Sequence, residues 1–83
     1  MNWTAEEDGD RTIERASAGP MRLFIVYRRG NPGSFHGEIS FESRDDRTGP
    51  VAFVDAPDAK TLRKEMVLRA RDLCQQMLDK LYP

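Results

Sequence analysis

Cysteine and histidine are almost absent from this chain of 83 residues, which contains one of each. Because a disulfide needs two cysteines, none can form within the chain, and we expect a reducing, cytoplasmic environment. A zinc site usually takes several His, Cys, Asp or Glu ligands that converge on one point. His36 and Cys74 fall in different expected elements, so we expect neither a bound metal nor another cofactor.

Long hydrophobic runs are also absent. The longest run covers residues 23–27, whereas a membrane-spanning helix needs about 20 apolar residues. The N-terminus carries acidic residues where a secretory signal would have a basic and then an apolar stretch. We therefore expect no membrane association and no Sec-type export.

The chain has no strong excess of charge of either sign, and its formal net charge is −1. Residues 1–20 hold five acidic and two basic side chains, and the remainder holds nine acidic and eleven basic ones. Residues 21–83 therefore carry only a small positive excess. Such a charge gives no strong attraction for nucleic acid or an anionic membrane.

Residues 1–20 are polar and acidic, and Trp3 and Ile13 are their only large apolar side chains. Gly9 interrupts the segment, and Gly19-Pro20 marks its end. This composition predicts a disordered N-terminal segment, followed by a single small domain at residues 21–83.

The C-terminal part of that domain predicts one long amphipathic helix at about residues 56–82. Asp55 is placed to act as its N-cap, and Pro57 would lie in the first turn. A spacing of about 100° per residue aligns one broad apolar stripe. Its members are Ala59, Leu62, Met66, Ala70, Leu73, Cys74, Met77 and Leu81.

Three shorter segments predict strands at about residues 21–28, 35–42 and 51–54. Residues 21–28 are rich in β-branched and aromatic side chains, and residues 35–42 alternate strictly between apolar and polar. The simplest assembly is an α+β domain, in which a three-stranded antiparallel meander sheet is packed by the C-terminal helix.

The first of these strands is apolar on both faces. Leu23 and Ile25 point toward the expected helix, which leaves Phe24 and Val26 on the other face. Either the N-terminal segment covers this pair, through Trp3 or Ile13, or another chain does. The edge of the same strand also invites pairing if it is free.

These features favour a small non-enzymatic protein that binds a protein partner or a second copy of itself. Its site would use the exposed sheet face and the edge of the first strand. The expected partner-binding residues are Phe24, Val26 and Leu68, of which Leu68 points outward from the helix.

Two alternatives stay open. A nucleic-acid-binding accessory protein would use the arginines of the loops, although acidic residues are interleaved with them. An enzyme would depend on His36 and Glu38, which have no nucleophile near them in the sequence. We expect no catalytic residue. The candidate nucleic-acid contacts are Arg28, Arg29, Arg44 and Arg47.

Overall fold

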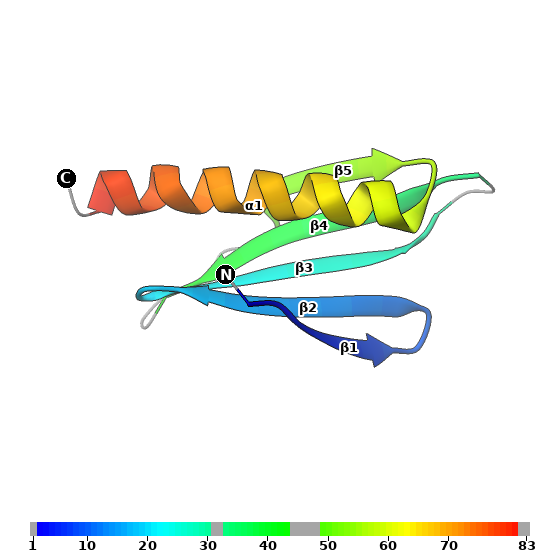
Figure 1. The fold of residues 1–83 in the computed structure, drawn as a ribbon, viewed down its shortest axis with the longest axis horizontal. Coiled ribbons are helices and arrows are strands. Elements are labelled where there is room, and N and C mark those ends of the chain that lie inside the picture. The colour runs from blue at the N-terminus through cyan, green and yellow to red at the C-terminus, as the bar shows by residue number, and fades with distance from the viewer. Residues whose placement is uncertain (1, 31–32, 44–48, 82–83) are drawn as a thin grey trace.

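A computed structural model describes residues 2–30, 33–43 and 49–81 of the chain. They form five antiparallel strands in the order of the sequence and then one helix (Figure 1). The expected class, an antiparallel sheet with a C-terminal helix, is confirmed. The elements are β1 (Thr4–Asp8), β2 (Arg11–Ala18), β3 (Met21–Arg29), β4 (Phe35–Glu42), β5 (Ala52–Ala56) and α1 (Ala59–Leu81).

The expected number of strands is wrong, because residues 4–18 form β1 and β2 where disorder was predicted. Each of the two hairpins that add these strands turns through two residues, Gly9-Asp10 and Gly19-Pro20. Both glycines have a positive φ, of 65° and 61°. Glycine at the first loop position is typical of a type II′ hairpin turn. The glycines therefore connect strands and do not mark the end of a disordered segment.

The extra strands change the position of β3, the strand that was expected to offer a free edge. It is hydrogen-bonded to β2 on one side and to β4 on the other, so that expectation is wrong. The edges of the described sheet are β1 and β5.

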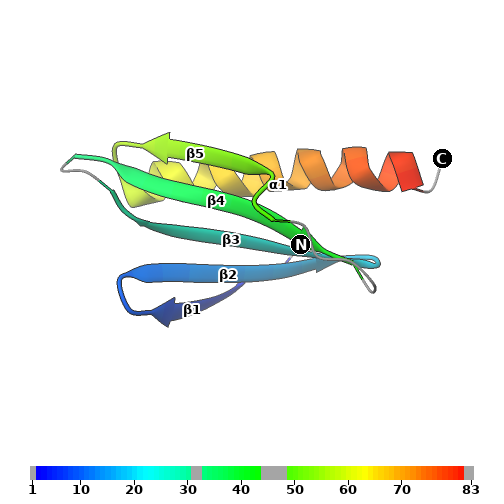
Figure 2. The ribbon, with the colours of Figure 1, turned by 180° about the vertical axis from the view of Figure 1, so that it is seen from behind.

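The core lies between α1 and one face of the sheet, and the helix contacts β3, β4 and β5 (Figures 1 and 2). The predicted apolar faces of the strands and the helix meet here, as expected. Strand and helix periodicities each place a stripe of apolar side chains on this side. The fully buried large side chains are Leu23, Ile25, Ile39, Phe41, Leu62, Met66 and Cys74.

The helix begins later than predicted because β5 continues through Ala56. Asp58 is its N-cap, and Asp55 is not. The Thr61 amide N–H donates to Asp58 Oδ1 at 2.7 Å, and the Thr61 hydroxyl donates to Oδ2 at 3.0 Å. These hydrogen bonds hold the pKa of Asp58 below its ordinary value of 3.8, because they favour the ionised carboxylate.

The lowered pKa predicts that the cap stabilises the fold above pH 3.8 and loses this effect as the pH falls through the folded-state pKa. The Asp58→Ala variant should therefore be less stable than the wild type at about pH 7, and the difference should narrow at about pH 3. Urea unfolding followed by circular dichroism at both pH values measures this. Asp72→Ala, an exposed change within the helix, should show no such pH dependence. Equal behaviour of the two variants would contradict the assignment of the cap.

Candidate functional site

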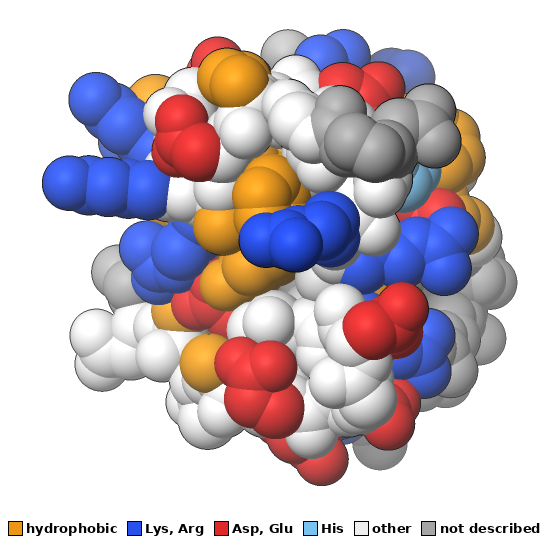
Figure 3. All heavy atoms as spheres, turned by 90° about the vertical axis from the view of Figure 1, so that its right-hand side faces the viewer, with side chains coloured by type: hydrophobic (Ala, Val, Ile, Leu, Met, Phe, Trp, Pro, Cys, Tyr) orange, Lys and Arg blue, Asp and Glu red, His pale blue; other side chains and the backbone are white. Residues whose placement is uncertain are grey.

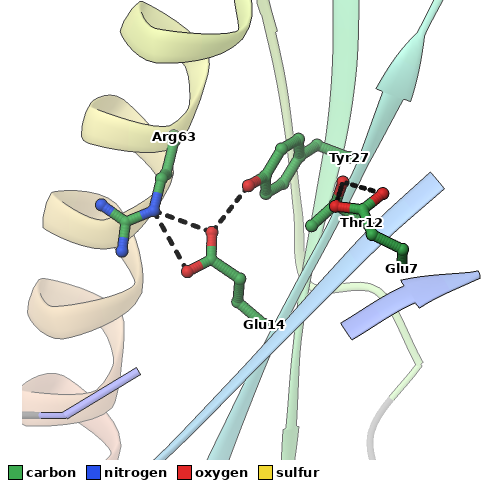
Figure 4. A network of polar contacts seen from close by, with 5 residues as sticks. All are labelled: Glu7, Thr12, Glu14, Tyr27 and Arg63. Atoms are coloured by element: carbon green, nitrogen blue, oxygen red, sulfur yellow. Dashed lines mark hydrogen bonds and ion pairs between the residues drawn. The ribbon is translucent and has the colours of Figure 1, made fainter. Parts of the chain in front are cut away.

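One buried carboxylate fixes the N-terminal hairpin to the rest of the molecule. Glu14 on β2 is only 3% exposed, and it points into the space between β3 and α1 (Figure 4). The Tyr27 hydroxyl donates to Glu14 Oε2 at 2.8 Å. Arg63 Nε–H donates to the same oxygen at 2.8 Å and to Oε1 at 3.1 Å. A strand, its neighbour and the helix therefore converge on a single side chain.

The same contacts shift the ionisation of both partners. Burial, the hydrogen bond to Glu14 and the negative charge of Glu14 together raise the pKa of Tyr27 to about 12, and burial makes the largest contribution. The hydrogen bond to Glu14 also raises the pKa of Arg63. The phenol therefore stays protonated, and the guanidinium stays charged, over the whole neutral range.

Strand β1 is held to β2 by polar pairs on both of its faces. Thr12 donates to the Glu7 carboxylate at 3.1 Å on the helix side (Figure 4). On the other side, Arg15 lies 2.8 Å from Glu6, and Arg11 lies 2.9 Å from Asp8. Each exposed pair contributes at most about 1 kcal/mol, so β1 depends on its hydrogen bonds to β2 for its position.

The sheet face opposite α1 is the candidate functional site, and we call it the open face. It is the side on which Phe24 and Val26 lie, because they alternate with the buried Leu23 and Ile25. The strand register brings two further apolar residues to this face. Ile13 on β2 is the cross-strand partner of Val26, and Phe53 on β5 lies on the far side of Glu38. Phe53 is 57% exposed.

Charges of both signs surround these apolar residues. Strands β2 and β3 supply the arginines of the open face, and the other strands, β1, β4 and β5, supply its carboxylates. Figure 3 views the end of the molecule where α1 begins, and it shows blue and red side chains mixed around the single histidine. The charged residues of the open face are Arg11, Arg15, Arg22, Arg28, Glu6, Asp8, Glu38, Glu42 and Asp55.

His36 lies on this face between two carboxylates. Its Nδ1 is 2.8 Å from Asp55 Oδ1, and its Nε2 is 3.9 Å from Glu38 Oε1. Its ring stacks on Phe53, with the ring centroids 5.9 Å apart. A general base needs one nitrogen directed at a nucleophile or a substrate. Here both nitrogens face acids, so the arrangement is that of a histidine held in a cross-strand polar cluster.

The structure separates the predicted partner-binding residues. Phe24 and Val26 lie together on the open face, each partly buried. Leu68 is 42% exposed on the outer surface of α1, on the other side of the molecule. The helix and the sheet lie between them, so one partner surface cannot combine all three.

The predicted nucleic-acid contacts are separated as well. Consecutive strand residues point to opposite faces, so Arg28 lies on the open face and Arg29 on the helix side. The Arg29 guanidinium lies 5.6 Å from the centre of the Phe35 ring. Arg44 and Arg47 lie outside the described residues.

Sequence reasoning missed Phe53 and Asp55 as residues of the site, and it considered Ile13 only as a cover for Phe24 and Val26. The sequence of residues 52–55, Ala-Phe-Val-Asp, could have indicated the first two of these residues. If Ala52 and Val54 face the core, Phe53 and Asp55 lie on the opposite face. Ile13 carried no such signal, because it belongs to a segment that was not expected to fold.

Comparison with known protein families, curated proteins and solved structures found no match to the chain. Among the residues that the structure describes, no group of three or more His, Cys, Asp or Glu side chains is arranged to hold a metal ion. Within the same residues, α1 lacks the apolar character that crossing a membrane requires.

The Glu14 network predicts a strong energetic coupling between β2 and α1. Arg63→Met leaves a buried carboxylate with one donor fewer, so we expect a loss of about 2–3 kcal/mol in the free energy of unfolding. This value is at the low end for buried pairs because the Arg63 side chain is 46% exposed. The double variant Glu14→Leu/Arg63→Met removes the charge together with its partner.

We expect the double variant to lie within about 1 kcal/mol of the wild type. Urea unfolding of the wild type, both single variants and the double variant gives the coupling energy. A Lys64→Met variant serves as the control, because it removes an exposed charge of the helix at the next position. Additive effects of the two single changes would show that the network does not couple the two elements.

Proposed function

We propose that this protein is a small non-enzymatic module that binds another protein, or a second copy of itself, through its open face. The observation that supports the proposal most directly is a row of apolar side chains across the middle of that face, in which Ile13 and Val26 are partly exposed and Phe53 is exposed. Ile13 and Val26 lie side by side, and Phe53 continues the same row beyond Glu38. The helix covers only the other side of the sheet, so folding of the chain alone leaves this surface in contact with water.

The composition of the open face is typical of a protein interface. Aromatic residues and arginine are enriched at interfaces, because they combine a large contact area with specific hydrogen bonds. The open face has Phe24 and Phe53; Arg15 is the cross-strand partner of Phe24, and Arg22 lies two residues before it on β3. A partner with apolar residues inside a rim of mixed charge would complement it.

The charge pattern disfavours the nucleic-acid alternative. Binding to a nucleic-acid backbone requires a surface with a clear excess of basic groups, whereas the open face carries four arginines and five carboxylates. Three arginines of the open face lie within 4 Å of a carboxylate, in the pairs Arg11–Asp8, Arg15–Glu6 and Arg22–Glu42. In addition, Arg28 and Arg29 point to different faces and cannot form one contact surface.

The test compares two ways of removing exposed apolar surface. Val26→Thr/Phe53→Thr changes the open face and keeps residues that favour strands. Leu68→Gln removes a similar group from the outer surface of α1 and keeps a residue that favours helices. We expect the first variant to weaken self-association or partner binding by roughly tenfold or more, and the second to leave it unchanged.

Self-association is measured by sedimentation equilibrium, and partner binding by quantitative affinity capture from cells that produce the protein. Circular dichroism and thermal unfolding check that each variant is folded. If Leu68→Gln reduces binding while the open-face variant does not, the partner binds the helix and the proposal is wrong. Unchanged binding in both variants would also reject it.

A further inference from the structure

The two strands of the N-terminal hairpin differ in length, and this difference leaves part of β2 without a neighbour on one side. Strand β1 begins at Thr4, opposite Arg15, whereas β2 continues to Ala18. Before Thr4 the chain turns toward the helix side, where Trp3 packs against the core (Figures 1 and 2). Within the described residues, the Ala16–Ala18 segment therefore pairs with β3 alone.

A groove of about 930 Å³ lies at this edge. We call it the notch. Backbone groups of a strand point alternately to its two sides, so some N–H and C=O groups of the Ala16–Ala18 segment face the notch. An extended chain that follows the line of β1 would pair with them, as in other cases of strand addition. The residues that line the notch are Asn2, Thr4, Arg15, Ala16, Ser17, Arg22 and Phe24.

The charge of the notch selects the chemistry of the added strand. Its lining includes two guanidinium groups, Arg15 and Arg22, and no carboxylate. Their side chains are 50% and 70% exposed, even though each contacts one acid at the rim, Glu6 or Glu42. A guanidinium has five N–H donors, so each arginine retains donors for a second carboxylate.

The register places these two arginines around one position. Ser17 is the cross-strand partner of Arg22, and Arg15 is two residues away from Ser17 on the same face of β2. A residue of the added strand opposite Ser17, with its side chain on the open face, would lie within reach of both arginines. The Phe24 ring provides apolar surface beside the same position. An acidic residue at this position, on a strand that ends before Thr4, fits this arrangement.

We propose that the notch binds an extended acidic segment of a partner protein by strand addition to β2, with one carboxylate held by Arg15 and Arg22. This inference rests on the proposed function, since it specifies which part of a protein partner contacts the open face.

Nuclear magnetic resonance on the ¹⁵N-labelled full chain tests the proposal with a defined probe. The probe is an end-capped hexapeptide of alternating valine and glutamate, which is compared with the same peptide carrying glutamine. We expect the acidic peptide to shift the amide signals of Ala16, Ser17 and Ala18 and the Nε–H signals of Arg15 and Arg22. We expect roughly fivefold weaker binding of the glutamine peptide, since charge-assisted hydrogen bonds are lost.

One variant and a matched control test the role of Arg22. Arg22→Gln should lower the affinity for the acidic peptide to that of the glutamine peptide. Arg69→Gln, an exposed change on α1, should leave both affinities unchanged. Raising the salt concentration should weaken the acidic peptide more than the neutral one. Sodium acetate serves as a free carboxylate control and should not shift the Ala16–Ala18 amides.

The outcomes also separate this inference from the proposed function. If only the amide signals of Val26, Glu38 and Phe53 shift, strand addition at the notch is rejected. The open face would then still be a binding surface, as the proposed function states. Equal binding of the two peptides, no shifts at all, or the same shifts with acetate would each reject the notch as a site for an acidic strand. The Val26→Thr/Phe53→Thr comparison would still decide the proposed function.

Discussion

The hydrogen-bonded ion pair between Glu14 and Arg63 is the interaction on which the rest of the structure depends. A carboxylate that is 3% exposed loses its hydration, so the fold has to provide donors for it. Tyr27 on the next strand, β3, and Arg63 on α1, 49 residues away, provide them. A buried pair of this kind contributes little net stability compared with apolar packing. Its effect is to select one arrangement of β2 relative to the helix.

The position of β2 relative to the helix determines which side chains lie on the open face. Side chains of a strand alternate between the two faces, so a shift of β2 by one residue would exchange all of them. Ile13 and Arg15 would then point toward the helix, and Glu14 would point to water. With Glu14 fixed in the interior, Ile13 extends the apolar row of β3, and Arg15 borders the notch. The buried pair on one side of the sheet thus defines the recognition surface on the other.

The sequence predicted those parts of the fold whose side chains follow a simple period. Strands β3 and β4 and the apolar stripe of α1 are of this kind, because packing alone decides which way their residues point. Strand β2 does not follow this rule: its inward residues are Thr12, Glu14, Ala16 and Ala18, and polar and charged residues among small ones give no apolar alternation. Only the distant Arg63 and Tyr27 make Glu14 an acceptable interior residue, and no local pattern contains that information.

The same limit applies to the site. Phe24 and Val26 were identified because β3 is visibly apolar on both faces, while Ile13 required the missing strand. Asp55 was assigned to the helix because an acidic residue before a proline resembles a cap. In the structure it pairs with His36 across the sheet, and Asp58 caps the helix. Aspartate is a favoured N-cap residue at either position, and only the length of β5 distinguished the two.

The central claim is that β2 is an integral strand of the sheet, held by Glu14. Amide hydrogen exchange of the full chain, followed residue by residue, tests it most directly. The account predicts that the amides of β2 are protected to within about tenfold of those in β3, and that Arg63→Met lowers the protection of β2 more than that of β4. Exchange of the β2 amides at the rate of an unfolded chain, while β3 and β4 stay protected, would contradict it.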